Sequence, residues 1–94
     1  MPDTPVPVHE PAGNRFSVSG EGVTAVVEYT IDGDVMTILH TLVPEALGGR
    51  GVAGALVRAA LDFARSEGLR VRPTCSYADA WMRRHPDYDS LRIA

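Results

Sequence analysis

Four glycines stand within seven residues, directly after an apolar, β-branched run and directly before the best helix-forming segment of the chain: Gly48, Gly49, Gly51 and Gly54. Glycine is the costliest residue to order, so four of them at a helix start need a reason. A tight turn from a strand into a helix points several backbone N–H groups at one spot, where the helix dipole adds partial positive charge. This pattern indicates anion binding, most naturally of phosphate. The alternative is close packing of the helix on a strand, which one or two small residues would satisfy.

Two familiar phosphate-binding loops do not fit this stretch. The dinucleotide fingerprint G-x-G-x-x-G can be laid over Gly49, Gly51 and Gly54, but it opens a βαβαβ fold and needs an acidic residue about 20 positions later. A chain of 94 residues that opens with an antiparallel hairpin does not match it. The P-loop requires a lysine, and all nine basic residues are arginine. The same composition excludes Schiff-base chemistry on a lysine.

Two further side chains are of types that carry chemistry. His40 has a ring that can accept a proton near neutral pH, although a lone histidine in a strand is as readily a hydrogen-bonded structural residue. Cys75, the only cysteine, is either a small hydrophobe or a nucleophile whose thiolate needs a nearby cation. The three histidines and one cysteine show no metal-ligand spacing, so we predict no metal site.

The composition limits the classes of partner. Hydrophobic residues make up 45% of the chain and charged residues 22%, with a net charge of -3, which is typical of a globular domain and gives no basic footprint for nucleic acid. No apolar run approaches the roughly 18 residues of a membrane span, and the first residues lack the signal-peptide pattern. We expect one cytoplasmic domain without nucleic-acid or membrane partners. The sequence does not indicate an oligomeric state.

The glycines lie between a predicted strand and a predicted helix. Short strands are expected over 14–20, 23–31 and 35–43, the last two joined by the hairpin residues Asp32-Gly33. Strict alternation along 35–43 puts His40 on one face with Met36, Ile38 and Leu42, and leaves Val35, Thr37, Leu39, Thr41 and Val43 on the other. A helix is predicted from Val52 to Glu67, and its apolar positions are Val52, Leu56, Val57, Ala60, Leu61 and Ala64.

The segments that follow complete a strand–helix–strand unit. Residues 69–77 are predicted to form a strand parallel to 35–43 through a right-handed crossover, and residues 78–85 a short helix that ends before Pro86. Residues 1–12 contain four prolines and are expected to be a flexible arm. The predicted fold class is α+β, an antiparallel meander plus one β-α-β crossover, with residues 13–94 as a single domain.

Two motifs resemble the GNAT superfamily of N-acetyltransferases. Val43-Pro44 followed by Gly48-Gly49-Arg50-Gly51-Val52-Ala53 is similar to motif A, in which a strand ending in V-x-P-x precedes [RQ]-x-x-G-x-[GA] and a helix. Gly48 replaces the usual Arg or Gln of that motif. The H-T-x-V pattern before the loop and C-x-Y-x-x-x-[WYF]-[ILM]-x-[RK]-x-P-x-[YW] after it resemble the small single-domain branch, from about residue 15 to residue 90; the second pattern is matched by Cys75, Tyr77, Trp81, Met82, Arg84, Pro86 and Tyr88.

The resemblance implies a minimal acyl-CoA N-acyltransferase fold with a splayed central strand pair that holds acetyl-CoA. In that superfamily the loop amides hold the pyrophosphate, and a backbone N–H near Leu42 or Val43 polarises the thioester. Arg83 and Arg84 are candidates for the 3′-phosphate of CoA, although solvated helix-end arginines are the commoner finding. The implied cofactor-binding residues are Leu42, Val43, Gly48, Gly49, Arg50, Gly51, Val52, Ala53, Gly54, Arg83 and Arg84.

The same resemblance suggests catalytic roles for His40, Cys75 and Tyr77. His40 would accept the proton of an ammonium substrate, Cys75 would relay the acetyl group, and Tyr77 would either protonate the departing thiolate or simply anchor the last helix. Many relatives carry a glutamate where Leu42 stands. Direct transfer is favoured, because a Cys75 thiolate needs a cation and only His40 is a plausible one. The expected function is acetyl-CoA-dependent N-acetylation of a small-molecule or peptide amine; the alternative is a non-enzymatic CoA- or acyl-CoA-binding module.

Overall fold

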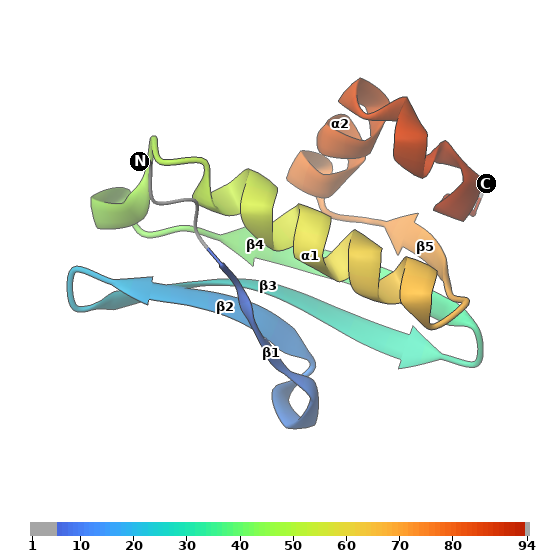
Figure 1. The fold of residues 1–94 in the computed structure, drawn as a ribbon, viewed down its shortest axis with the longest axis horizontal. Helices are drawn as coiled ribbons and strands as arrows, with labels where there is room; N and C mark the ends of the chain where they lie inside the picture. The colour runs from blue at the N-terminus through green and yellow to red at the C-terminus, as the bar shows by residue number, and fades with distance from the viewer. Residues whose placement is uncertain (1–5, 94) are drawn as a thin grey trace.

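The computed structural model describes residues 6–93, which form one five-stranded sheet with its helices packed on one face (Figure 1). The strands lie in sequence order, with β1 to β4 antiparallel and β5 parallel to β4. Their bounds are β1 Val8–Glu10, β2 Arg15–Gly20, β3 Val23–Asp32, β4 Val35–Leu42 and β5 Arg70–Pro73. The α-helices are α1 Val52–Ser66 and α2 Ser76–Arg84, and three 3₁₀ turns are η1 Pro11–Gly13, η2 Glu45–Leu47 and η3 Pro86–Leu91. This arrangement confirms the predicted α+β fold.

Part of the segment predicted to be a flexible arm is regular structure. Val8–Glu10 form β1 and pair with β2, and Pro11 begins the turn η1 instead of preventing order. The ring of His9 stacks on Phe16 at 4.2 Å and its Nε2 lies 2.6 Å from the Tyr29 hydroxyl oxygen, so side-chain contacts hold this edge strand. A proline lacks only its own backbone N–H donor for the hydrogen bonds between strands, and β1 contains no proline. The prediction for residues 1–5 lies outside the described residues.

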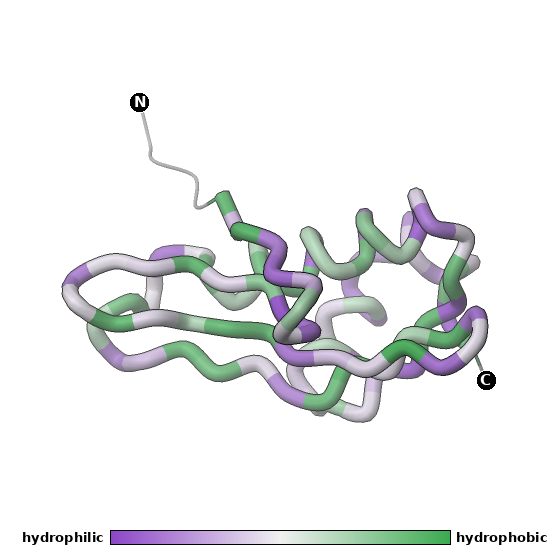
Figure 2. Tube along the Cα trace, turned by 90° about the horizontal axis from the view of Figure 1, so that it is seen from below, coloured by the Kyte–Doolittle hydropathy of each residue, from purple (hydrophilic) through white to green (hydrophobic). Residues whose placement is uncertain are grey.

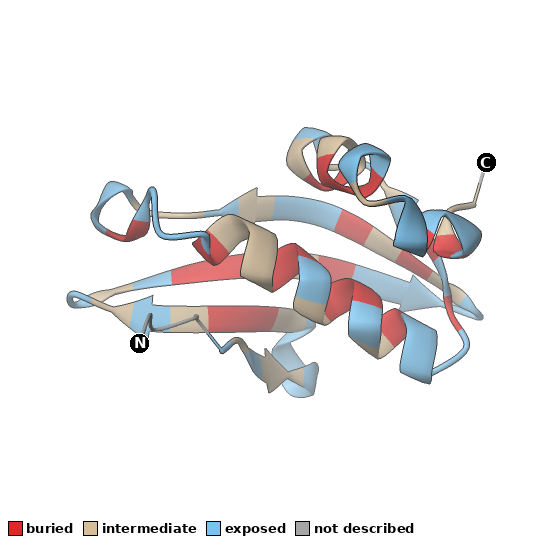
Figure 3. Ribbon diagram, turned by 45° about the horizontal axis from the view of Figure 1, so that its top comes forward, coloured by how far each residue is buried: buried red, intermediate tan, exposed pale blue. Residues whose placement is uncertain are grey.

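The core lies between α1 and the sheet (Figure 3). All six apolar positions predicted for the inner face of α1 are buried, which confirms the helical periodicity. They pack against side chains of the sheet, and hydrophobic stretches of the strands are interrupted by hydrophilic residues (Figure 2). The sheet residues in this core are Phe16, Ala25, Val27, Tyr29, Met36, Ile38 and Val71. Among the described residues, no helix is long and apolar enough to cross a lipid bilayer.

A β-bulge interrupts the pairing of β3 with β4. From the hairpin end, Asp32 pairs with Val35 and the register runs regularly as far as Tyr29 opposite Ile38. The next pair is Glu28 opposite His40, so Leu39 is an extra residue of β4 without a partner on β3.

The bulge reverses the faces expected for the second half of β4. Met36 and Ile38 point into the core as alternation requires, but beyond Leu39 it is Thr41, opposite the buried Val27, that lies on the helix side. His40 and Leu42 lie on the other face, called here the open face, where Leu42 is 55% exposed. The predicted grouping of His40 and Leu42 with Met36 and Ile38 is therefore wrong, because an inserted residue shifts the period-2 alternation by one.

The parallel pairing of β4 with β5 is short. It ends at Ile38 opposite Pro73, and the Ile38 carbonyl accepts hydrogen bonds from the N–H groups of Thr74 and Cys75 before the chain turns into α2. The predicted strand over 69–77 is thus too long, since Pro73 cannot donate to a ladder and the next residues begin a helix. Residues 39–42 of β4 have no ladder partner on β5. β4 and β5 therefore diverge at this point.

Candidate functional site

The glycine turn enters α1 through a backbone conformation that other residues avoid. Gly49 and Gly51 have φ angles of 75° and 74°, and Gly51 is the N-cap of α1. A Cβ on either residue would meet no heavy atom within 4 Å, so packing does not explain these two glycines. Their positive φ angles explain them, because glycine adopts this left-handed conformation without a steric penalty. Close packing, the alternative interpretation, applies instead to Gly54, where a Cβ would lie 3.2 Å from Nε1 of Trp81.

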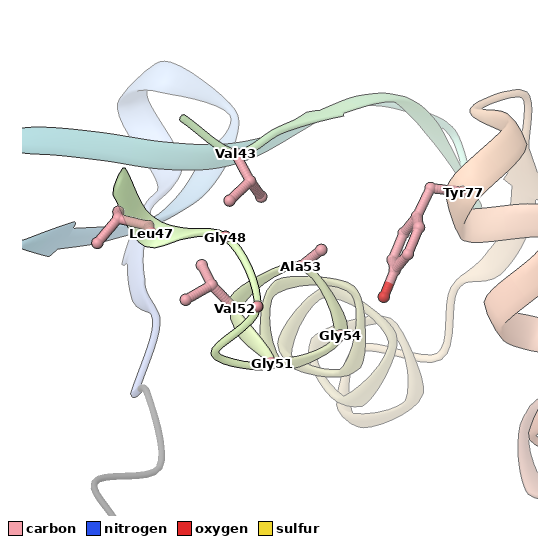
Figure 4. Close-up of a pocket in the computed structure, with 9 residues that line it drawn as sticks. Val43, Leu47, Gly48, Gly51, Val52, Ala53, Gly54 and Tyr77 are labelled. Atoms are coloured by element: carbon pink, nitrogen blue, oxygen red, sulfur yellow. The ribbon is translucent and has the colours of Figure 1, made fainter. Parts of the chain in front are cut away.

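The turn borders a pocket of about 320 Å³ (Figure 4). One wall is the backbone of the turn and the first residues of α1, and the opposite side is formed by Val43, directly after β4, and by Tyr77 of α2. Seven residues from the predicted cofactor set line it, together with Leu47 and Tyr77; the seven are Val43, Gly48, Gly49, Gly51, Val52, Ala53 and Gly54. The structure thus brings most of the predicted set together around one pocket, and their binding of a cofactor stays a prediction.

The pocket meets a helix start whose N–H groups have no side-chain cap. Gly51 offers no capping side chain, and the first turn of α1 holds no acidic residue. The first N–H groups of a helix lack partners within the helix, and its dipole is positive at that end. Nothing in this turn neutralises that positive end, which suits a bound anion.

Arg50 lies beside the pocket but is not among its lining residues. Its guanidinium is 3.5 Å from a carboxylate oxygen of Glu21, and both side chains are more than half exposed. An exposed pair of this kind contributes little to stability, so Arg50 can exchange Glu21 for another anion at small cost.

Tyr77 reaches the site from α2. It lies in the first turn of α2, and its hydroxyl oxygen would be 3.5 Å from a Cβ at position 54. Figure 4 shows the ring pointing from α2 toward the start of α1. The small size of Gly54 lets Tyr77 and Trp81 approach α1 closely. Tyr77 therefore helps join the two helices and lines the pocket, and its role as proton donor to the departing thiolate stays a prediction.

Cys75 is the N-cap residue of α2, half-buried, with its Sγ 3.5 Å from the Thr41 hydroxyl oxygen. Partial burial alone would raise the pKa of the thiol, but the backbone N–H groups of Ala78 and Tyr77 and the Thr41 hydroxyl outweigh it and bring that pKa below its ordinary value. The sulfur does not complete a capping hydrogen bond, so the amides act as nearby partial positive charges. These partners come from backbone and hydroxyl groups and not from a charged side chain, and the expectation that a Cys75 thiolate needs a nearby cation stays a prediction.

His40 lies on the open face of β4. Its Nε2 is 2.6 Å from Oε1 of Glu28, the residue opposite it on β3, and its side chain is 52% exposed. Thr41, the next residue, lies on the helix side and contacts Cys75. His40 and the thiol thus belong to opposite faces of the strand. The structure does not bring His40 to Cys75 as its charged partner.

Comparison with known proteins identifies the family of this chain. A model of the GCN5-related N-acetyl-transferase family matches residues 15–91. The chain belongs to that family. It is 37% identical over 81 residues to Protein NATD1 of Mus musculus, and 36% identical over 81 residues to Protein NATD1 of Homo sapiens. Each alignment covers 83% of this chain, and 74% and 72% of the mouse and human proteins.

A solved structure supports the same fold. The NMR structure of a GCN5-like protein from Staphylococcus aureus matches with a TM-score of 0.76, covers 97% of this chain and 90% of the other, and is 24% identical in sequence. At that identity the likeness concerns the fold. It confirms the GNAT-like architecture predicted from the two motifs.

Three other predicted cofactor residues are not among those that line the pocket. The side chain of Leu42 points to the open face, but the prediction concerns a backbone N–H near Leu42 or Val43 and is not tested by that orientation. Arg83 and Arg84 lie in the last turn of α2, opposite the end that carries Tyr77, and Arg83 donates to Asp79 at 3.1 Å. Their contact with the 3′-phosphate of CoA stays a prediction.

Sequence reasoning missed two residues of this region. Leu47, which is 3% exposed, lines the pocket from η2. Its large apolar side chain in a segment otherwise typical of a loop was the signal that could have identified it. Glu28 was also missed as the partner of His40. Counting back from the Asp32–Val35 pair would put Leu39, not His40, opposite Glu28, and only the bulge brings the two side chains together.

Proposed function

We propose that this chain is an acetyl-CoA-dependent N-acetyltransferase that acts on a small-molecule or peptide amine. The observation that supports the proposal most directly is the glycine turn: two left-handed glycines expose backbone N–H groups at an uncapped helix start that borders a pocket. Membership of the GCN5-related N-acetyltransferase family, whose members generally use acetyl-CoA, points the same way.

The residues present fit this cofactor. The N–H groups at the start of α1 suit its pyrophosphate, because they are donors that no carboxylate of the first turn competes for. Arg50 is near enough to the turn to add one charge, in place of the side chain that Gly48 lacks. Val43 and Leu47 give the pocket an apolar side. When bound, acetyl-CoA would supply an acetyl thioester, which a neutral amine can attack.

The proposed catalytic groups divide between the two faces of β4. His40, on the open face, accepts the proton of the incoming ammonium group, since only a neutral amine is a nucleophile. Tyr77, at the pocket, is placed to donate a proton to the departing thiolate. We propose direct transfer, because the half-exposed ring of His40 can be reached by an amine from solvent. The lowered pKa of Cys75 favours the alternative, an acetyl-cysteine relay.

The proposal can be tested through heat stability. Acetyl-CoA at 100-fold its dissociation constant should add about 2.7 kcal/mol to the free energy of unfolding if it binds only the folded state. Gly51→Val should remove that gain, because a branched side chain there blocks the backbone donors and cannot easily hold a φ of 74°. Unchanged melting of the wild type at millimolar acetyl-CoA would contradict the proposal.

Gly68→Val is the matched control for this experiment. Gly68 lies just past the other end of α1, has a φ of 72° and, like Gly51, has no heavy atom within 4 Å of a built Cβ. Both variants carry similar backbone strain, but only Gly51 borders the pocket. Gly68→Val should melt lower and still respond to acetyl-CoA. If Val prevents folding, the Gly51→Ala and Gly68→Ala pair makes the same comparison.

The second candidate is a module that binds CoA without transferring an acetyl group. The exposed Leu42, at the position where many GNAT enzymes carry a glutamate, favours it. Both candidates predict the same stabilisation by acetyl-CoA. Release of free CoA in the presence of a panel of primary amines separates them, because only the enzyme turns over.

A further inference from the structure

A row of four charged or titratable side chains crosses the open face of the sheet. Register pairs Glu10 with Arg15, Arg15 with Glu28 and Glu28 with His40, so one residue from each of β1 to β4 stands in line. Along the row, the two carboxylates alternate with the guanidinium of Arg15 and the imidazole of His40. Cross-strand neighbours of this kind interact directly, so each side chain can choose between two partners.

The contacts show how the row divides. Arg15 donates through Nε and Nη2 to Glu10 Oε1, at 3.2 and 3.1 Å, and Ser17 donates to the other oxygen of the same carboxylate. These bonds lower the pKa of Glu10, the Ser17 hydrogen bond most, so that it stays an anion for Arg15. With Arg15 held by Glu10, the Glu28 carboxylate is left to His40, 2.6 Å away.

We propose that Glu28 is the positioning residue of His40. A carboxylate only accepts hydrogen bonds, so Nε2 of His40 must carry the hydrogen and Nδ1 keeps its lone pair. The proton of an acceptor ammonium then moves to Nδ1, which leaves a neutral amine and an imidazolium whose charge faces the Glu28 carboxylate. Glu28 thus supplies, from β3, the carboxylate that this chain lacks at Leu42. The catalytic part of this inference rests on the proposed function.

The first test reads the ring of His40 without any acetyl transfer. Long-range ¹H–¹⁵N NMR correlations of ¹⁵N-histidine protein, at a pH where the ring is neutral, distinguish Nε2–H from Nδ1–H. We expect Nε2–H for His40 in the wild type and a mixture of tautomers in Glu28→Gln. His85 is an internal reference of the opposite kind, because its Nδ1 lies 2.7 Å from the Trp81 carbonyl and must donate to it. His40→Ala assigns the signals.

The second test measures acetyl transfer to an amine that the wild type accepts. Glu28→Gln should lower kcat about 10-fold with little change in KM for acetyl-CoA, by analogy with the loss of roughly 10–100-fold when the carboxylate partner of a metal-bound histidine is removed. Glu67→Gln, which removes a carboxylate at the end of α1, should change neither kcat nor the His40 signals.

The outcomes keep the two ideas apart. If Glu28→Gln leaves the tautomer of His40 unchanged, or if its kcat equals that of Glu67→Gln, the positioning role is wrong. If the tautomer changes as expected but wild-type protein acetylates no amine, the Glu28–His40 pairing stands as structure, its catalytic role is overturned, and the proposed function fails with it.

Discussion

The two sides of β4 differ in what they present within a few consecutive residues. On the helix side, Thr41 and Val43 are half-buried and border Cys75 and the glycine turn, where the donors are backbone N–H groups. On the open side, His40 and Leu42 are exposed, and the chemistry belongs to side chains. Strand alternation puts neighbouring residues on opposite faces, and one extra residue, Leu39, decides which of them lie on the helix side. A single strand can therefore separate a backbone site for an anion from a side-chain site for an acceptor.

Replacing one side chain on each face should break this comparison most clearly. His40→Ala should reduce kcat about 10²–10⁴-fold, the usual contribution of a positioned general base. Thr41→Val, its neighbour on the helix side, should stay within a few-fold of wild type, because the Thr41 hydroxyl contacts the Cys75 thiol, which direct transfer does not use. Steady-state kinetics with one amine measure both. Equal losses in the two variants would mean that the faces do not differ in function.

Two variants with opposite expected effects test the role of Arg50 in acetyl-CoA binding on the helix side of β4. Arg50→Ala should weaken acetyl-CoA binding by roughly 1 kcal/mol, about fivefold, as expected for an exposed charge near a phosphate. Glu21→Gln should instead tighten binding slightly, because it frees Arg50 from its 3.5 Å partner. Isothermal titration calorimetry gives both dissociation constants. A change of the same sign in both variants would argue against a role for Arg50 in binding.

Cys75→Ala asks whether the helix side takes part in the chemistry itself. Under direct transfer, kcat should fall by less than about threefold, the change expected from lost packing around a half-buried side chain. A nearly inactive variant, together with a hydroxylamine-sensitive acetyl adduct on the wild-type peptide that contains Cys75, would establish the relay instead. The chain has no lysine, so the adduct has no competing side-chain amine.

The smallest expected effect is a pH dependence of stability. The pKa of Cys75 is lower in the folded protein than in the unfolded chain, so folding favours the thiolate. This contribution is fully present above the unfolded pKa and is lost as the pH falls through the folded pKa. Urea unfolding should therefore show wild type gaining slightly over Cys75→Ala as the pH rises through that window. A difference between the two proteins that stays constant with pH would contradict the assignment.

The site was predictable where backbone conformation determines it and not where one residue changes a register. Glycines at 49 and 51 reveal the turn because few other residues adopt its φ, and the 3.6-residue spacing of α1 fixed its buried face. The face of His40 depends on Leu39, and nothing in the type of Leu39 signals a bulge. The Glu28–His40 contact depends on that same residue. The position of Cys75 at the start of α2 was missed because the sequence-based strand was extended past Pro73 to residue 77.

Both borders of the sheet are built to resist unwanted association between molecules. At one border, β5 has four residues, ends at Pro73 and is covered by Ile93, whose N–H donates to the Val71 carbonyl at 2.9 Å. At the other border, β1 has three residues and lies between Pro7 and Pro11. Unpaired strand edges are templates for aggregation, and short edges flanked by proline are poor templates. A change that detaches Ile93 would uncover the longer of these two edges, so it should promote aggregation before it affects either face of β4.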